Sequence, residues 1–181
     1  YDHGRNCKGT HINCMTMRHP KGAINKKEKE WEKRFVYDQI MQEGYRTIQA
    51  TKPQSLGYSM IDSPVGIAAW ILEKFYSWSD LKNGKIEKTY TKDILLTNIM
   101  IYIVTNTFNT SSWIYFGRRE EGGRLFPSNF KKIKTPTGIA KYPKEMSEWP
   151  PKSYLNRIFK IQHWSEMNKG GHFAALEEPN L

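Results

Sequence analysis

Residues 169–179 read Lys169-Gly170-Gly171-His172-Phe173-Ala174-Ala175-Leu176-Glu177-Glu178-Pro179. The two glycines allow a sharp turn just before the histidine, because a residue without a Cβ escapes the usual steric limits. The segment after the histidine predicts the first turns of a helix, with two acidic side chains near its positive end. His172 is therefore expected on a tight loop that leads into a helix. Three roles are open for His172 at such a position: it can cap the helix, it can be partly buried, or it can point into a cleft and act as a base.

A histidine that acts as a base needs a carboxylate on its far ring nitrogen. Residues 132–145 predict a β-strand that ends in a proline-punctuated loop carrying Glu145. A short helix over 151–157 and a second strand over 158–165 then lead to His172. α/β-Hydrolases use this order to bring acid and base to the carboxyl ends of adjacent parallel strands. We therefore expect an α/β fold in which Glu145 and His172 are hydrogen-bonded.

Upstream of this region the chain predicts one strand followed by helices. Partial alternation over 7–17 indicates a strand. Asn25 can cap a helix over 26–43 that Gly44 ends, with apolar side chains at four-residue steps along one side. Residues 45–53 are rich in hydrogen-bonding groups and predict an exposed loop. A helix from Pro64 to about Trp78 is apolar almost all round and should be buried. Another helix is expected over 91–107, too short in its apolar run to span a membrane.

Composition favours a folded domain over a nucleic-acid-binding or disordered chain. The 181 residues are 38% hydrophobic and 13% aromatic, with a net charge of +10. In the most charged stretch, 26–33, lysines alternate with glutamates, as on a solvated helix face. The sequence shows no helix-turn-helix, RNP or zinc-finger spacing. It therefore predicts no nucleic-acid partner.

The two cysteines raise the question of a metal site. Cys7 and Cys14 are too few for a disulfide framework, and three histidines, His3, His11 and His19, lie nearby. The spacing lacks the close cysteine and histidine pairs of familiar zinc motifs. A strand over this stretch would also spread the side chains apart. The sequence therefore predicts no metal site, and it contains no glycine-rich phosphate loop that would hold a nucleotide cofactor.

Residues 5–181 closely resemble the C-terminal half of epoxide hydrolases of the microsomal and juvenile-hormone type. Gly170 to Ala175 matches the Gly-Gly-His-Phe-Ala-Ala setting of that family's base without change. Tyr142-Pro143-Lys144-Glu145 matches the Phe-Pro-x-Glu setting of its acid. Further matching runs are Lys8–Asn13, Gly44-Tyr45 with Ile48–Pro53, Asp62–Phe75 and Ser111–Gly117.

The resemblance implies the C-terminal part of an α/β-hydrolase fold carrying a helical lid. Residues 1–22 would supply a core strand, 23–122 the lid, and 123–181 the core with the acid and histidine loops. In the family, an aspartate opens the epoxide to form an alkyl-enzyme ester, and an activated water hydrolyses that ester to a vicinal diol. The resemblance assigns water activation to His172, orientation of His172 to Glu145, and proton donation to Tyr45. Tyr115 is the candidate second donor. The implied partners are a small-molecule epoxide and water, with no metal or organic cofactor.

The family's nucleophile has no counterpart in this sequence. Asp2 does not lie on a strand-to-helix elbow, and the other aspartates considered, Asp38, Asp62, Asp80 and Asp93, belong to predicted helices, caps or loops. We therefore expect a fragment of a longer enzyme that is close to inactive alone. We also expect its first strand to have an unpaired edge through which the chain self-associates.

Two other functions remain open from the sequence. The chain could be a non-catalytic remnant or binding module whose lid pocket holds apolar ligands. It could also be a related hydrolase that uses the same base with another nucleophile, although the lid tyrosine Tyr45 argues against this. The resemblance leaves open the particular epoxide, the compartment and the oligomeric state.

Overall fold

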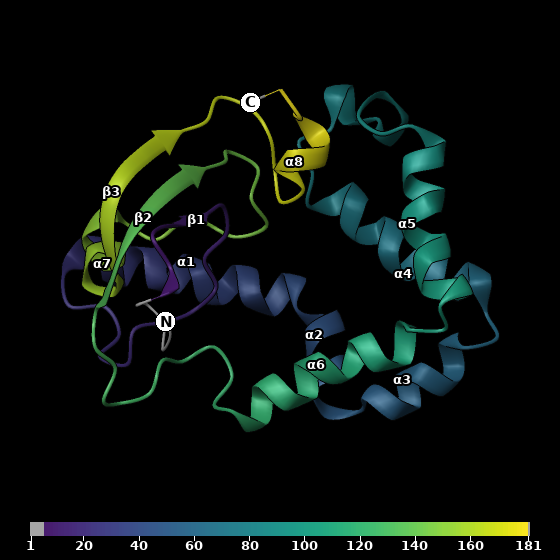
Figure 1. Cartoon of the computed structure of the whole chain (residues 1–181), viewed down its shortest axis with the longest axis horizontal. Helices are drawn as coiled ribbons and strands as arrows, with labels where there is room; N and C mark the ends of the chain where they lie inside the picture. Colours follow the sequence, from purple (N-terminus) through teal and green to yellow (C-terminus); the bar gives the residue numbers. More distant parts are fainter. Residues whose placement is uncertain (1–5, 181) are drawn as a thin grey trace.

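Three parallel strands form the sheet in the computed structural model, which describes residues 6–180 (Figure 1). They are β1 (Thr10–Ile12), β2 (Ile133–Lys141) and β3 (Phe159–Glu166), in the order β1-β2-β3. His11 pairs with Gly138 and Ile139 with Trp164. Because all three strands run the same way, the loops that follow them meet at one edge of the sheet. A further parallel bridge between Lys144 and Gly171 ties together the loops after β2 and β3.

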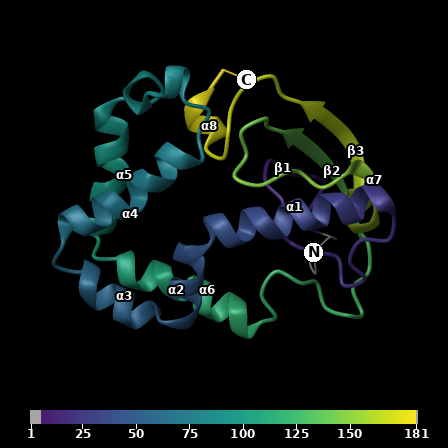
Figure 2. The ribbon, with the colours of Figure 1, turned by 180° about the vertical axis from the view of Figure 1, so that it is seen from behind.

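The main core lies between the sheet and two helices, α1 (Lys26–Gln42) and α7 (Lys152–Ile158). Figure 2 shows α1 running along one face of the sheet. Asn25 caps α1 by accepting a hydrogen bond from the Glu28 backbone N–H. Trp31 and Phe35 of α1 are buried in the same cluster as Ile139 of β2 and the α7 residues Tyr154, Leu155 and Ile158. The helix that the sequence places in the lid therefore contributes directly to the core of the sheet.

The remaining helices form a second layer beside the sheet (Figures 1 and 2). This layer contains two hydrophobic clusters. The buried residues of one are Leu56, Ile67, Ile99 and Phe108, and those of the other are Phe75, Tyr90 and Leu95. Two short 3₁₀ turns, η2 (Lys82–Gly84) and η3 (Ile86–Lys88), lie between α4 (Pro64–Ser77) and α5 (Lys92–Val104). The last short helix, α8, lies against one end of this layer. The longer helices are α2 (Gly44–Thr51), α3 (Pro53–Met60), α4 (Pro64–Ser77), α5 (Lys92–Val104) and α6 (Phe108–Glu120), and α8 is Ala174–Glu177.

Most predicted elements are confirmed within a few residues. The strands β2 and β3 and the helices α1, α4, α5, α7 and α8 all occur at the predicted positions. Ser63 and Thr91 begin α4 and α5 by accepting hydrogen bonds from backbone N–H groups of the first turn. The α/β fold class is confirmed, because a parallel sheet lies against helices in the predicted order. The predicted division at residues 22 and 122 stays a prediction.

Three local predictions are wrong. Residues 45–53 are not a loop, because 44–51 form α2, which packs on α6 and buries Gln49 and Ala50. Helix α4 is not buried all round, because it packs mainly on α5 and leaves Val65 77% exposed. The strand expected over 7–17 shrinks to three residues, which pair with β2 on one side.

The predicted apolar side of α1 is also only half right. Trp31 and Phe35 are buried, whereas Val36 and Ile40 are exposed and line an open hollow between α1 and α2. Among the described residues, no helix combines the length and apolar character needed to cross a bilayer.

Candidate active site

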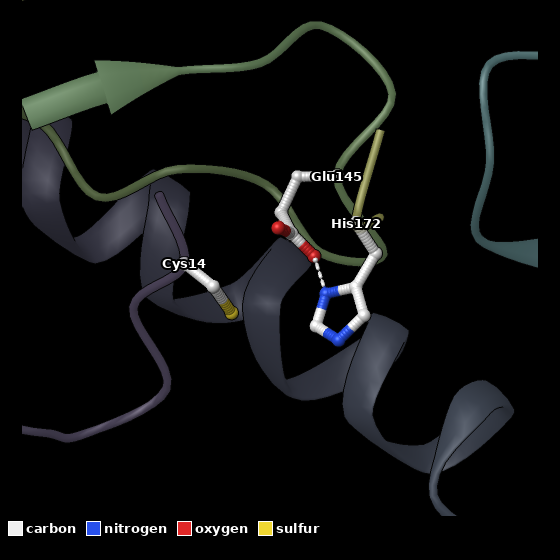
Figure 3. Close-up of side chains that lie close together, drawn as sticks. All are labelled: Cys14, Glu145 and His172. Atoms are coloured by element: carbon white, nitrogen blue, oxygen red, sulfur yellow. Dashed lines mark hydrogen bonds and ion pairs between the residues drawn. The ribbon is translucent and has the colours of Figure 1, made fainter. Parts of the chain in front are cut away.

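The structure brings Glu145 and His172 into direct contact (Figure 3). His172 Nδ1 lies 2.7 Å from Glu145 Oε1, and the Met146 backbone N–H donates to the same carboxylate oxygen. The Glu145 side chain is 3% exposed and that of His172 is 26% exposed. Because an ionised carboxylate only accepts, we assign the proton to Nδ1, which leaves Nε2 with a lone pair. An imidazole in this tautomer can take a proton from water.

Two glycines allow the turn that presents His172. Gly170 has a φ of +103°, and a Cβ there would meet the Tyr142 ring at 2.7 Å. At Gly171 a Cβ would lie 2.5 Å from the Trp78 carbonyl oxygen. The same carbonyl accepts a hydrogen bond of 2.8 Å from the His172 N–H. The histidine loop, residues 170–173, therefore approaches the backbone at Trp78 too closely for a side chain at position 171.

Glu177 fastens the histidine loop to the helical layer. Its Oε2 accepts hydrogen bonds from the backbone N–H groups of Gly171 and Asp80, at 2.9 and 2.7 Å. Its Oε1 accepts one from Phe173 N–H at 2.9 Å. The Asp80 carboxylate accepts a further hydrogen bond from Gly170 N–H at 3.0 Å. We call these four hydrogen bonds, which are accepted by Glu177 and Asp80, the clasp. Burial raises the pKa of the Glu177 carboxyl, although the three hydrogen bonds act in the opposite direction.

The predicted lid tyrosines lie together on two helices. Tyr45 is in the first turn of α2 and Tyr115 is in α6, with ring centroids 5.7 Å apart in an edge-to-face arrangement. The Trp78 ring lies 5.2 Å from the Tyr45 ring and 5.2 Å from the His172 ring. Burial raises the pKa of the Tyr45 hydroxyl, and the neighbouring Tyr115 adds to the shift. The Tyr45 hydroxyl is therefore protonated at neutral pH and able to donate.

One cavity of about 460 Å³ is bordered by Tyr45, Tyr115 and His172. Its walls are largely aromatic and aliphatic. They are contributed by helices of the helical layer and by the histidine loop, and include Trp70, Ile71, Phe75, Phe108, Ile114 and Phe173. An apolar cavity with a few convergent polar groups is the usual form of a small-molecule site.

Cys14 is a neighbour of the acid–base pair that the sequence did not predict. One potential ligand atom from each of Cys14, Glu145 and His172 lies within 4.8 Å of the other two. Burial, followed by the negative charge of Glu145, raises the pKa of the Cys14 thiol to about 12. Three other residues that the sequence analysis weighed as metal ligands belong to no such cluster in the described chain: Cys7, His11 and His19. His3 lies outside the described residues.

Sequence reasoning also missed Trp78 and Glu177. Trp78 appeared only as the end of a predicted helix, and Glu177 only as a charge near a helix N-terminus. Their roles have no local sequence signal, because Trp78 accepts from His172 and Glu177 accepts from Asp80, each across about ninety residues of chain.

The aspartates considered as nucleophiles do not border the cavity in the described part of the chain. Asp38 and Asp93 lie within α1 and α5, and Asp62 precedes α4. The Asp80 carboxylate is bonded to the histidine loop. Asp2 lies outside the described residues.

Comparisons with known proteins identify relatives of the same kind. The chain is 40% identical to epoxide hydrolase 1 of Sus scrofa over 154 residues, which is 82% of this chain and 34% of that protein. It is 38% identical to juvenile hormone epoxide hydrolase 2 of Ctenocephalides felis over 149 residues, 78% of this chain and 32% of that protein. The chain thus spans about a third of the length of these curated relatives. No protein-family model matches the chain.

Solved structures agree with these sequence matches. The structure of juvenile hormone epoxide hydrolase from the silkworm Bombyx mori superposes with a TM-score of 0.77 and 26% identity, covering 95% of this chain and 46% of that one. The epoxide hydrolase of Aspergillus niger gives a TM-score of 0.70 at 26% identity, covering 96% of this chain and 43% of that one. In sequence and in fold, the chain therefore belongs to the epoxide hydrolases of the microsomal and juvenile-hormone type, within the α/β-hydrolase superfamily.

Proposed function

We propose that this chain carries the water-activating part and the lid of an epoxide hydrolase active site. The observation that supports this most directly is the Glu145–His172 hydrogen bond at the edge of a cavity that Tyr45 and Tyr115 also border. A base, its orienting acid and two hydroxyl donors around one apolar cavity match the needs of epoxide hydrolysis. The nucleophile is an aspartate from outside residues 6–180.

The reaction divides between these groups in two steps. The aspartate oxygen forms a bond to an epoxide carbon, the ring C–O bond breaks, and Tyr45 donates its proton to the developing alkoxide, with Tyr115 as the second donor. His172 Nε2 then takes a proton from water, and the hydroxide attacks the ester carbonyl carbon. The acyl C–O bond breaks, and the leaving oxygen takes the proton of the new carboxyl group, which releases the diol and restores the aspartate. The imidazolium proton then returns to the Tyr45 phenolate, so that His172 and Tyr45 are also restored. General-base catalysis of this kind contributes about 10²–10⁴-fold.

Glu145 keeps the imidazole in the productive tautomer and stabilises the imidazolium formed in the second step. Its burial makes this interaction strong, because water does not compete for the carboxylate. The substrate is an epoxide with an apolar body, since the cavity walls are mainly aromatic and aliphatic.

The first test reads the coding DNA upstream of Tyr1. An in-frame Gly-x-Asp-x-Gly elbow would supply the nucleophile, and the whole reading frame can then be assayed on styrene oxide. His172→Ala in that protein should abolish turnover while the alkyl-enzyme ester accumulates, seen as added substrate mass on the intact protein. Loss of turnover without any ester would contradict the assignment of His172 to the second step.

Tyr45→Phe tests the proton donor in the same protein. It should slow formation of the ester and leave the rate of its hydrolysis unchanged, because the hydroxyl acts only on the epoxide oxygen. Tyr58→Phe is a matched control, since Tyr58 is exposed on the neighbouring helix α3. Equal rates of ester formation in Tyr45→Phe and wild type would remove Tyr45 from the mechanism.

The 181-residue chain alone should be close to inactive on styrene oxide, because it has no covalent route to the diol. Turnover comparable to an intact epoxide hydrolase, abolished by His172→Ala, would show that the nucleophile lies within this chain.

A second candidate function is binding of apolar ligands without catalysis. The apolar walls of the cavity favour it, and Trp70 and Trp78 border the cavity as built-in fluorescent reporters. Quenching by an alkyl amide that cannot react would measure such binding. If no reading frame that includes this chain turns over an epoxide, yet the chain binds the amide, the binding function is favoured.

A further inference from the structure

Three different metal-ligand groups converge at the carboxyl edge of the sheet. Cys14 follows β1, Glu145 follows β2 and His172 follows β3, so the parallel order of the strands brings them to one place (Figure 3). Their potential ligand atoms all lie within 4.8 Å of one another. We propose that Cys14, Glu145 and His172 bind a divalent cation of borderline softness, with Zn²⁺ as the fitting ion.

A second observation points to a missing positive partner at this place. Glu145 Oε1 is bonded to His172, whereas Oε2 is fully buried without a nitrogen or oxygen donor among the described residues, and the Cys14 thiol is the group that interacts with the carboxylate from this side. The side chain as a whole is 97% buried, which follows from its exposed fraction of 3%. A thiol is only a weak donor to a buried carboxylate, whereas a cation bound between the two groups would satisfy the oxygen fully.

The donor set fits zinc. Thiolate sulfur, imidazole nitrogen and carboxylate oxygen are the three ligand types that proteins use for Zn²⁺. A tetrahedral site needs its ligand atoms about 3.3–3.6 Å apart, so side-chain shifts of about 1 Å would complete the coordination. Three protein ligands leave a fourth position for water. The thiol loses its proton on coordination, as metal-bound thiols do.

Arg124 is the charge that opposes a cation here, because it acts electrostatically on Cys14. Its guanidinium is engaged in an ion pair with Glu43 and a hydrogen bond to Gln39, which offset much of its charge. With Cys14 as thiolate and Glu145 ionised, the ligands supply two negative charges. The local balance therefore favours a dication.

Metal binding would take both members of the acid–base pair. The cation would occupy Glu145 and a ring nitrogen of His172, so the imidazole could no longer accept a proton from water. This consequence rests on the proposed function, whereas the binding itself rests only on the geometry. The site would make the hydrolase sensitive to zinc in a way that depends on Cys14.

The binding test uses the 181-residue chain with Co²⁺ as a spectroscopic substitute for Zn²⁺. Wild type should show a near-ultraviolet thiolate-to-cobalt band that Zn²⁺ removes. Cys14→Ser should lose that band and bind Zn²⁺ at least about tenfold more weakly in competition with a chromophoric chelator. Cys7→Ser is the matched control, since Cys7 is exposed and outside the cluster, and it should behave as wild type. Equal zinc affinity in Cys14→Ser and wild type would overturn the proposal.

A measurement on the unmodified chain guards against a variant that fails to fold. Zn²⁺ should slow alkylation of Cys14 by iodoacetamide but not that of Cys7, as read by peptide mass spectrometry. Unchanged labelling of Cys14 at saturating Zn²⁺ would also overturn the site. The catalytic consequence is separate: Zn²⁺ should inhibit styrene oxide hydrolysis by the complete reading frame, and Cys14→Ser should relieve it. Zinc binding without any epoxide turnover would leave the metal site standing and contradict the proposed function instead.

Discussion

Replacement of Glu177 by alanine should destabilise the protein more than its place in a short terminal helix suggests. Glu177 is 4% exposed and accepts three backbone hydrogen bonds, from Asp80, Gly171 and Phe173. Alanine would leave these donors without their partner. The Gly171 donor is buried and the Asp80 and Phe173 donors are partly buried. At about 1 kcal/mol for each lost hydrogen bond, the free energy of unfolding should fall by about 3 kcal/mol.

Urea unfolding, followed by circular dichroism, measures this loss. With a typical urea dependence of about 2 kcal/mol per molar, the midpoint should fall by about 1.5 M. Glu178→Ala is the matched control, because Glu178 is the next residue and its ion pair is with the exposed Lys169. Its midpoint should stay close to that of wild type. A Glu177→Ala midpoint equal to that of Glu178→Ala would refute the role of the clasp.

The same variant should loosen the histidine loop. Residues 170–173 are held to Asp80 and Trp78 by backbone hydrogen bonds that Glu177 helps to fix. In Glu177→Ala, amide hydrogen exchange of this loop should become faster under native conditions, while exchange in β2 stays slow. Unchanged exchange in the loop would mean that the other contacts hold it alone.

The charge of Glu177 predicts a pH dependence with a definite sign. Burial raises the pKa of this carboxyl in the folded state above its usual value of 4.5. The folded state therefore binds the proton more tightly than the unfolded state, and this contribution to stability is fully present below pH 4.5. It is lost as pH rises through the raised pKa. Glu177→Gln should flatten this part of the stability profile, and an unchanged profile would contradict the assignment.

Three further predictions concern the rest of the fold. Glu28→Gln should lower the free energy of unfolding by about 3 kcal/mol in a urea titration, because the fully buried carboxylate is the ion-pair partner of Arg157 at 3.0 Å. A loss below about 1 kcal/mol would contradict this role of the ion pair. Gly170→Ala should lower the melting temperature, because Gly170 has a positive φ and a Cβ there would collide with the Tyr142 ring. Gly44→Ala is the control and should not lower it, because the space around its Cβ position is open. Equal melting temperatures of the two variants would refute this prediction. Finally, the chain should self-associate with rising concentration in sedimentation velocity, through the edge of β1 that has no neighbouring strand among residues 6–180. A single monomer species at all concentrations would contradict that prediction.

Much of the architecture could be predicted from short stretches of sequence. Asn25, Ser63 and Thr91 mark helix starts because each side chain can satisfy a backbone N–H of the first turn, whatever the rest of the chain does. The strand-like runs that predict β2 and β3 are equally local. The order of these elements was sufficient to predict that Glu145 and His172 meet, because parallel strands bring their following loops to one edge.

The predictions that the structure corrected concern segments whose conformation or burial depends on elements distant in the sequence. Gly44 is a plausible helix end by composition, yet residues 44–51 form a helix that packs on α6 and buries Gln49 and Ala50. Helix α4 is apolar almost all round, yet exposed residues such as Val65 remain because too few elements pack on it. Apolar periodicity predicts which side can be buried, but only the arrangement of neighbours determines which side is.

The sequence by itself determined the family, the starts of α1, α4 and α5 and the pairing of Glu145 with His172, because these depend on local chemistry and on the order of elements along the chain. Only the tertiary structure decided the clasp at Glu177, the place of Trp78 between Tyr45 and His172, and the position of Cys14 beside the acid–base pair. Each of these joins segments that are tens of residues apart. Hydrogen bonds and ring contacts act over a few ångströms, and folding alone brings such distant segments to that separation.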